Sequence, residues 1–385
     1  MRTPRVLLTA AAALAVALPA FLAAPSSADP GGGADRGAPG TWTRISSGSV
    51  GNVVEPGLYR TSNGVLHVFY RRERGAVDDI AFTNIGANGR TGATGTVVAG
   101  WSALSTDPKP ITTGSGMRVM FAGIRTGDPL DPYHTGQMFA SSAVAAGTSW
   151  FLEGAFTDSA YAIDSYGTGA TTLANHQPVV SFPLNATMTW NDGVDHTFTF
   201  SQALYGSTLV RSGSQVWISF AALGNTAGTT GLFVKRLLPT VGPTTKVPQS
   251  SQGTSTLSPL QSTAFVARPG GGLHLAYCIG YPTCSKVGLW RVGTAQARAV
   301  PGSAGARDIS LSAAPHGRMW VAWTTYDRVK VVPTSATGLT FGGVRTLRQP
   351  NAAGLYGVNV AGTDRSADVV VNNGSALFHQ QVRLP

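Results

Sequence analysis

A seven-residue strand pattern returns along this chain at a nearly constant interval. It consists of a small residue, any residue, and then apolar residues at every second position, as in GVLHVFY at 64–70. Further copies begin at residues 115, 176, 214, 271, 317 and 365, on average about 50 residues apart. Apolar alternation with a period of two indicates a β-strand, and a repeat of this length is typical of a propeller or a solenoid. The chain is therefore expected to repeat one small β unit seven times.

Each repeat has room for four short strands. A strand precedes most copies, as in GLYRTS, STLVRS and DISLSA, and a third follows after a loop, as in DDIAFT, GLFVKR and VGLWRV. Four antiparallel strands in about 50 residues make one propeller blade. We therefore expect an all-β fold, a single β-propeller of seven four-stranded blades, with six blades as the alternative count. A pair of β-sandwiches is the alternative architecture.

Blade packing explains why the recurring strand carries aromatic side chains on both of its faces, such as Phe69, Trp217 and Trp320. Ring closure requires a blade assembled from both chain ends, because an open ring would expose a sheet edge. TWTRIS at 41–46 is the expected closing strand. It should pair with the last blade, which ends at ALFHQQVRL.

The amino-terminal segment has the composition of an export signal. Two arginines among the first five residues precede an apolar run and a small-x-small cleavage site ending at Ala28. This pattern predicts a secretory signal peptide over 1–28, with a retained membrane anchor as the alternative. Residues 29–40 are rich in Gly and Pro and predict a flexible leader, so the propeller is expected over 41–385. The protein is then secreted, with no membrane span after signal removal.

Positive charge is concentrated in the middle of the chain. The formal net charge is +10, and no Asp or Glu occurs between His196 and Arg307. Such a sector attracts anionic glycans, cell-wall polymers or nucleic acid, although a merely cationic soluble surface explains it as well. The basic residues are scattered singly without a nucleic-acid motif. The expected partner is therefore a glycan or cell-wall polymer, with an anionic polymer as one of the alternatives. Nucleic acid is not expected.

Cys278 and Cys284 enclose the loop IGYPT. In an exported protein such a pair is expected to form a disulfide. Zinc is the competing use of two cysteines, but no Cys or His partners stand at zinc-finger spacing. No cofactor or metal is expected, with structural calcium as the one alternative.

The first repeat, PGLYRTSNGVLHVFYRRERGAVDDIAF, resembles the opening blade of sialidases and related BNR-repeat propellers. Pro56, the turn at Gly64, the strand at 65–70 and an Asp at 78 or 79 follow in the order of that blade. The resemblance implies a propeller that acts on or binds glycans on the face carrying the loops between second and third strands. The connections that lead into each first strand belong to the same face.

Two departures set this chain apart from sialidases. Where they carry the first arginine of the triad that holds the substrate carboxylate, this sequence has Val54 and Glu55. Their Asp-box turn survives only as AVAAGTSW at 143–150, with alanines in place of the polar pair. Sialidase activity is therefore expected to be weak or absent.

Three loops contain candidate site residues. RRERGAVDD at 71–79 gathers three arginines and two acids: Arg71, Arg72, Arg74, Asp78 and Asp79. Arginines clamp carboxylates with paired hydrogen bonds and an Asp can act as a general acid or base, whereas the alternative is a solvated ion-pair cluster.

The second loop, RTGDPLDPYHTG at 125–136, holds a mixed set: Arg125, Asp128, Asp131, Tyr133 and His134. Its paired acids suit glycoside cleavage or calcium, but the two Asp-Pro steps also make ordinary turns. In the third loop the disulfide would brace Tyr281, which could stack on a sugar ring or pack locally.

His67 and His274 occupy the same place in two repeats, which favours a packing role over metal binding. No nucleophile motif is present. The expected function is recognition of extracellular glycan or cell-wall carbohydrate by a sialidase-like propeller, with Arg71, Arg72, Arg74, Arg125, Tyr133, His134 and Tyr281 as ligand-binding candidates. A glycoside hydrolase using Asp78, Asp79, Asp128 or Asp131, and a non-enzymatic protein-interaction platform, are the alternatives.

Overall fold

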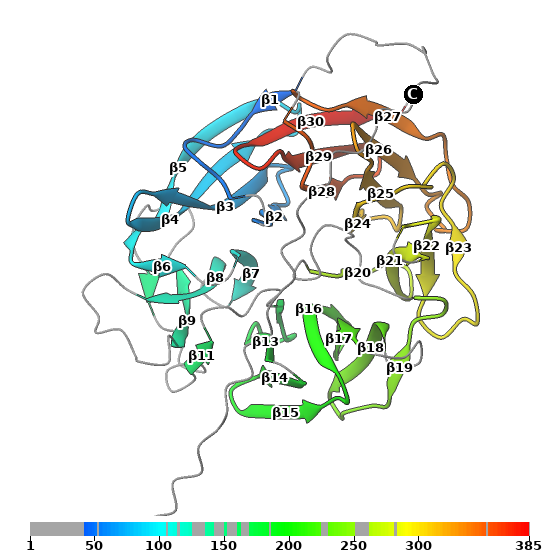
Figure 1. Cartoon of the computed structure of the whole chain (residues 1–385), viewed down its shortest axis with the longest axis horizontal. Helices are drawn as coiled ribbons and strands as arrows, with labels where there is room; N and C mark the ends of the chain where they lie inside the picture. Colours follow the sequence, from blue (N-terminus) through cyan, green and yellow to red (C-terminus); the bar gives the residue numbers. More distant parts are fainter. Residues whose placement is uncertain are drawn as a thin grey trace, which may run out of the picture. The chain divides into compact units, whose positions relative to one another are not determined.

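The described residues of the computed structural model all lie within Pro39–Pro385. They form antiparallel sheets arranged as a β-propeller (Figure 1). The all-β propeller expected from the sequence is confirmed, and the sandwich alternative is wrong. The structure describes residues 42–51, 54–104, 107–113, 116–124, 135–141, 150–151, 160–162, 169–184, 186–224, 230–250, 262–280, 283–351 and 353–384.

Within these residues, six sheets have the regular four strands of a propeller blade. In chain order, five of them contain β2 (Gly57–Arg60), β3 (Leu66–Arg74), β4 (Val77–Ile85) and β5 (Thr91–Trp101); β12 (Gly169–Thr172), β13 (Pro178–Leu184), β14 (Thr187–Asn191) and β15 (Asp195–Thr199); β16 (Ala203–Ser212), β17 (Gln215–Leu223), β18 (Gly231–Leu238) and β19 (Thr244–Lys246); β20 (Ala264–Ala267), β21 (Leu273–Ile279), β22 (Lys286–Arg291) and β23 (Arg298–Ala299); and β24 (Asp308–Ala313), β25 (Met319–Thr324), β26 (Arg328–Pro333) and β27 (Arg345–Arg348). The sixth contains β28 (Gly357–Gly362), β29 (Ser366–Asn372), β30 (Leu377–Arg383) and β1 (Thr43–Arg44).

One further sheet departs from the four-stranded plan. It contains β6 (Ala103–Leu104), β7 (Lys109–Thr113), β8 (Gly116–Ile124), β9 (Thr135–Ser141), β10 (Trp150–Phe151) and β11 (Ala160–Ala162). β8 pairs with β6, β7 and β9, and β9 also pairs with β10 and β11. Six sheets thus match the expected four-stranded blade, and this sheet has a different set of strands.

The recurring strand is the second strand of its sheet and is buried on both faces. All six residues of β25 are buried. Its two tryptophans serve different neighbours because successive side chains of a strand point to opposite faces: Trp323 packs with residues of β21, β22 and β24, and Trp320 packs with residues of β28 and β29. Each blade therefore contributes to two hydrophobic cores, one on either side.

The ring closes through both ends of the described chain, as expected. β1 pairs with β30 in antiparallel register, Thr43 opposite His379 and Arg44 opposite Phe378. The indole Nε1 of Trp42 also donates to the carbonyl of Arg348, 2.6 Å away in the preceding blade. The closing strand thereby covers the sheet edge that β30 would otherwise expose.

Inner strands line a central channel, and side chains connect neighbouring inner strands. The amides of Val358, Val360 and Gly362 in β28 donate to Asp308, Ser310 and Ser312 in β24, at 2.7, 3.1 and 2.9 Å, each pair 50 residues apart. The edge of β28 is satisfied in this way without a backbone ladder.

We call the end of the channel at the amino ends of the inner strands the front face, and the opposite end the back face. In β2, Gly57 lies at the front mouth and Arg60 at the back mouth. The β3–β4 hairpin extends beyond the front mouth, because Gly57 pairs with Phe69 and β3 continues to Arg74.

Candidate functional site

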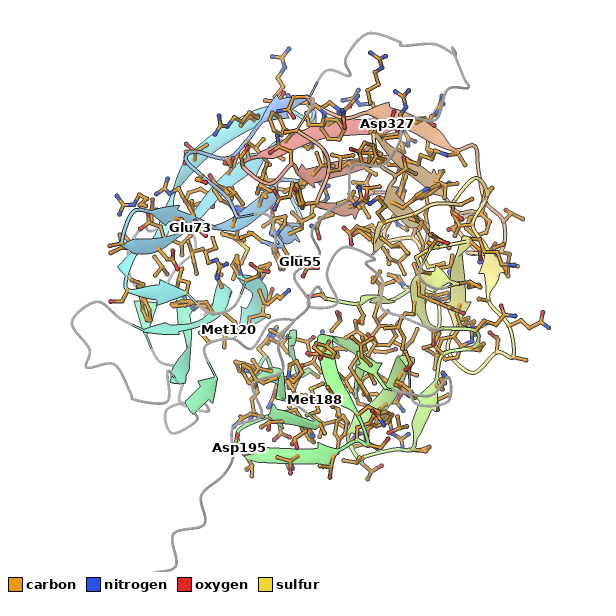
Figure 2. All side chains as sticks on the ribbon, in the orientation of Figure 1. Glu55, Glu73, Met120, Met188, Asp195 and Asp327 are labelled. Atoms are coloured by element: carbon orange, nitrogen blue, oxygen red, sulfur yellow. A yellow bond between two sulfur atoms is a disulfide. The ribbon has the colours of Figure 1, made fainter. Side chains whose placement is uncertain are left out.

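A cavity of about 240 Å³ opens at the front mouth of the channel. Residues from seven inner strands or the segments leading into them line it, including Gly57 of β2, Lys109 of β7, Gly169 of β12, Leu209 of β16, Ala264 of β20, Ser310 of β24 and Val360 of β28. Figure 2 shows Glu55 near the centre of the ring, whereas Glu73 and Asp327 lie farther out. The centre of the front face is therefore a concave site to which all the inner strands contribute.

Three residues from separate blades form a hydrogen-bonded set at this mouth. The Glu55 carboxylate accepts from the backbone amide of Ser262 at 3.0 Å and from Lys109 Nζ at 3.3 Å. Lys109 Nζ also donates to Ser262 Oγ at 2.8 Å. The Glu55 and Lys109 side chains are only 14% and 19% exposed, so water screens this ion pair less than it screens a surface pair.

The set leaves hydrogen-bonding groups available to a ligand. Its contacts with described residues use two of the three N–H groups of Lys109. Asn359 also lines the mouth, and its side-chain amide has no hydrogen bond with another described residue. The front mouth therefore offers both donors and acceptors within one small cavity.

Two further carboxyl groups lie beside this set. Asp107 accepts from the Glu55 amide at 2.9 Å, and burial, against the nearby charges of Arg71 and Lys109, raises the pKa of Asp107 to about 6. Asp308 is 5% exposed, and burial raises the pKa of its carboxyl well above the usual range despite a hydrogen bond from the Val358 amide. Both acids are easier to protonate than an exposed Asp.

Two exposed tyrosines lie on the same face. Tyr326, in the β25–β26 turn, is 76% exposed, and Tyr356, just before β28, is 39% exposed. The guanidinium of Arg307 lies 5.5 Å from the centre of the Tyr326 ring. Gly374 has φ +87°, and a Cβ atom there would lie 2.9 Å from the Tyr356 ring, so this turn needs glycine. The two rings provide exposed aromatic surface on the front face, outside the lining of the mouth.

The expected loop at 71–79 is a strand hairpin, with a turn only at residues 75 and 76. Its arginines are engaged within the protein. Buried Asp79 pairs with Arg72 at 2.7 Å and with Arg74 at 2.5 Å. Burial raises the pKa of Asp79, but hydrogen bonds from Arg72, Gly100 and Arg74 outweigh it and lower that pKa. Asp79 thus neutralises the guanidinium charge of two arginines that the sequence predicted to bind a ligand.

Arg71 and Asp78 brace the adjoining segment. Arg71 donates to the carbonyl of Leu104, and Asp78 accepts from the Leu104 amide at 2.8 Å. Burial raises the pKa of Asp78. Because Leu104 lies shortly before Asp107 and Lys109, these contacts position the segment that supplies two residues of the front mouth. A direct role of the five hairpin residues in binding or catalysis stays a prediction.

The other candidate residues lie outside the described part of the chain: Arg125, Asp128, Asp131, Tyr133, His134 and Tyr281. The degenerate Asp-box at 143–149 also lies outside it, so the proposed roles of these residues, calcium binding included, stay predictions. The disulfide between Cys278 and Cys284 is confirmed.

His67 and His274 occupy equivalent positions in β3 and β21, as the repeat predicted. Burial lowers the pKa of both imidazoles, to about 4 for His274, which also lies near Arg268. They are therefore neutral at pH 7. Among the residues that the structure describes, no three His, Cys, Asp or Glu side chains gather as around a metal ion.

Sequence reasoning noted Glu55 only as the replacement of a sialidase arginine, and it did not single out Asp107, Lys109, Ser262, Tyr326 or Tyr356. These residues stand in segments 30 or more positions apart, except Asp107 with Lys109. One available signal was their position just before an inner strand, which applies to Glu55, Asp107, Ser262 and Tyr356. No helix in the described ranges is long and apolar enough to cross a membrane.

No family model matches this chain, and no curated protein matches it in sequence. The resemblance of the first blade to sialidases therefore remains a resemblance. Solved structures with a similar fold include the β-propeller domain of the Trilobed protease from Pyrococcus furiosus, at 8% identity and TM-score 0.45 over 86% of this chain and 95% of that one.

A fucose-specific lectin from Aleuria aurantia is similar at 10% identity and TM-score 0.45, over 88% of this chain and 93% of that one. The Trypanosoma rangeli sialidase is similar at 12% identity and TM-score 0.45, over 87% of this chain and 55% of that one. At such low identities and scores, these likenesses carry no information about ligand or activity.

Proposed function

We propose that this protein is an exported propeller that binds glycan through its front mouth and holds one neutral or amino sugar residue there. The observation that carries the proposal is the set of Glu55, Lys109 and Ser262, which joins three blades across the mouth of a closed ring. Export rests on the signal sequence expected over 1–28.

The size and polarity of the mouth fit a sugar ring. A volume of about 240 Å³ holds about eight water molecules, which is comparable to a single hexose. Hydroxyl groups both donate and accept hydrogen bonds, and the mouth supplies Lys109 as a donor, Glu55 as an acceptor and the Asn359 amide as both. Tyr326 and Tyr356 on the same face suit the apolar faces of neighbouring sugar units.

Charge favours a neutral or amino sugar over an acidic one at this mouth. The carboxyl groups of Glu55 and Asp107 lie at or beside the mouth, against the single ammonium group of Lys109, whereas the burial that raises the pKa of Asp308 favours its neutral form. A ligand carboxylate would be repelled there, whereas a ligand amine would be attracted. Because Asp79 already pairs with Arg72 and Arg74, these arginines favour an acidic glycan on this face less than the sequence alone suggested.

The test is a glycan array on the full secreted chain, followed by calorimetry on the best neutral or amino ligand. Glu55→Gln removes the charge that holds Lys109 and should weaken binding about tenfold or more, since a charged hydrogen bond contributes about 1.5–3 kcal/mol. Tyr326→Ala should weaken binding about two- to tenfold. Glu73→Gln is the matched control, because Glu73 is exposed on the same face away from the mouth. Equal affinities for wild type, Glu55→Gln and Glu73→Gln would reject the site.

Glycoside hydrolysis is the second candidate, and the raised pKa of Asp107 favours it. A carboxyl group with a pKa of about 6 is suited to donate a proton to a leaving group, provided that a second carboxylate acts from the other side. Glu55 is the neighbouring carboxylate. Incubation of the best array ligand with wild type and with Asp107→Asn, followed by mass spectrometry, separates binding from cleavage. An intact ligand after prolonged incubation would reject hydrolysis while leaving binding in place.

A further inference from the structure

The back face of the propeller has a charge balance opposite in kind to that of the front mouth. Its mouth has a volume of about 760 Å³ and is lined by Arg60, Arg211 and His176 together with the hydroxyls of Thr112, Thr171 and Thr172. No carboxylate belongs to this lining among the described residues, but Arg60 is paired with the buried carboxylate of Asp368 at 2.5 Å, so Arg211 is the unpaired arginine of the lining. His176 has φ +65°, a conformation uncommon outside glycine, and it is exposed.

Four exposed arginines lie on turns or strand ends of the back face, and one of them, Arg211, also lines this mouth. Arg211 ends the inner strand β16, Arg291 ends β22, Arg365 lies in the β28–β29 turn, and Arg90 lies in the β4–β5 turn. The β4–β5 turn belongs to this face because Gln381 and Arg383, at the end of β30, donate to its carbonyls. The side chains of the four arginines make no hydrogen bond or ion pair with other described residues.

Other arginines of the back face are bonded to neutral groups and keep their full charge. Arg236, Arg268, Arg318 and Arg383 donate to backbone carbonyls of Thr240, Ala336, Thr334 and Asn88. The described carboxylates on this face are Asp192, Asp195, Asp364 and the buried Asp368, and each has a partner: His196 at 3.0 Å, Asn191 at 2.6 Å, His316 at 2.5 Å and Arg60 at 2.5 Å. The back face therefore carries a clear excess of guanidinium groups.

We infer that the back face is a second binding surface, for an anionic polysaccharide carrying carboxylate groups, separate from the proposed sugar site at the front mouth. Guanidinium groups pair with carboxylates through two parallel hydrogen bonds. Because the arginines lie on several blades around one mouth, a long chain meets more than one of them at a time. Exposed pairs are weak individually, so affinity depends on several simultaneous contacts.

The same surface is a poorer match to single-stranded nucleic acid. Base recognition without sequence preference relies on exposed aromatic side chains that stack on the bases. The exposed tyrosines of the described residues, Tyr326 and Tyr356, lie on the front face. The back mouth thus offers cations and hydroxyls but no exposed tyrosine, phenylalanine or tryptophan among its described lining residues.

The test measures binding of the full chain to polygalacturonate, neutral dextran and a single-stranded DNA oligonucleotide by biolayer interferometry at 20 and 300 mM NaCl. Polygalacturonate should bind at 20 mM and weaken strongly at 300 mM, because salt screens exposed charges. The double variant Arg211→Gln/Arg291→Gln should weaken this binding about three- to tenfold. Dextran should not compete.

Two controls identify the face. The double variant Arg44→Gln/Arg328→Gln lowers the net charge by the same amount as Arg211→Gln/Arg291→Gln. Its two positions lie away from the back face, Arg44 on the outer strand β1 and Arg328 at the start of β26, next to the front face. It should bind polygalacturonate as wild type does. Glu55→Gln should also bind it normally, so a failure of the sugar site and a failure of this surface are distinguishable. Circular dichroism of each variant verifies folding.

Three results would overturn the inference. The first is an absence of polygalacturonate binding by wild type at 20 mM NaCl. The second is an equal loss in both double arginine variants, which would indicate a general effect of net charge. The third is DNA binding as tight as polygalacturonate binding with the same dependence on Arg211 and Arg291, which would assign the surface to nucleic acid instead.

Discussion

Replacement of the buried Asp368 by Asn should destabilise the protein more than replacement of an acid on its surface. Asp368 is fully buried in β29 and bridges the last and first blades. One carboxylate oxygen pairs with Arg60 of β2 at 2.5 Å, and the other accepts from His379 at 2.8 Å and Gln381 at 3.2 Å. Asn keeps the shape of the side chain but removes its charge and turns one acceptor into a donor.

The magnitude follows from the burial of the partners. Removing one member of a buried ion pair costs about 3–5 kcal/mol. Arg60 is 17% exposed and keeps hydrogen bonds to the carbonyls of Gly64 and Ala361, so we take the lower end, about 3 kcal/mol. An unfolding entropy of about 2 cal/mol/K per residue converts this loss to a Tm decrease of about 4 °C for a propeller of this length.

Differential scanning calorimetry at pH 7 provides the measurement. Asp327→Asn is the matched control, because Asp327 is 54% exposed and its contact with Arg328 is 3.4 Å long; its effect should be below about 0.5 kcal/mol. A loss below about 1 kcal/mol for Asp368→Asn, or equal losses in both variants, would refute the role of this carboxylate in joining the blades.

The same carboxylate predicts a pH dependence. Burial raises the pKa of Asp368, but hydrogen bonds from His379 and Arg60 outweigh it and lower that pKa. The stabilisation is therefore fully present above the unfolded pKa of about 3.9 and is lost as pH falls through the folded value. The Tm difference between wild type and Asp368→Asn should shrink below pH 4, and a constant difference down to pH 2 would contradict this.

Three further changes test other parts of the molecule. Gly374→Ala should displace the Tyr356 ring and weaken binding to the front-face sugar several-fold, since its Cβ would lie 2.9 Å from that ring at φ +87°; unchanged calorimetric affinity would contradict the role of Tyr356. Wild type should lose stability from pH 4 to pH 7 through Asp107, whose pKa is about 6, because an acid with a raised folded pKa favours the folded state only at lower pH. The slope of Tm against pH should be flatter in Asp107→Asn than in wild type. The same slope in both proteins would contradict the raised pKa of Asp107. Replacing Cys278 and Cys284 by Ser should lower the free energy of unfolding in urea by about 2 kcal/mol, because the disulfide closes a loop of sequence separation 6. Equal stability of wild type under reducing and non-reducing conditions would contradict a stabilising role of the disulfide.

The strand repeat was predictable because each blade must bury the same strand between two neighbours. β25 illustrates this, since its alternating tryptophans pack against different blades. Ring closure by 41–46 and the disulfide were predictable for similar reasons, because a free sheet edge and a short loop between two cysteines each have few stable outcomes.

The front mouth was not predictable because its residues meet only when the ring closes. Glu55 and Ser262 are 207 positions apart and share a hydrogen bond. The pairing of the hairpin charges was not predictable either: two of the three arginines at 71–74 pair with Asp79, which lies directly opposite Arg72 on the neighbouring strand. The partner of a surface charge depends on strand register, which the loop composition did not indicate.

The closure of the ring has a mechanical consequence. β1 and β30 are antiparallel, and of their two paired positions Thr43 with His379 lies nearer to Trp42 and Leu384, the two ends of the described chain. Tension applied between Trp42 and Leu384 therefore peels the short strand away one hydrogen bond at a time, rather than loading all the bonds in shear. The bond from the Trp42 indole to Arg348 is among the first to be loaded. Under such a force the propeller opens at β1 while the packed cores between its other blades remain intact.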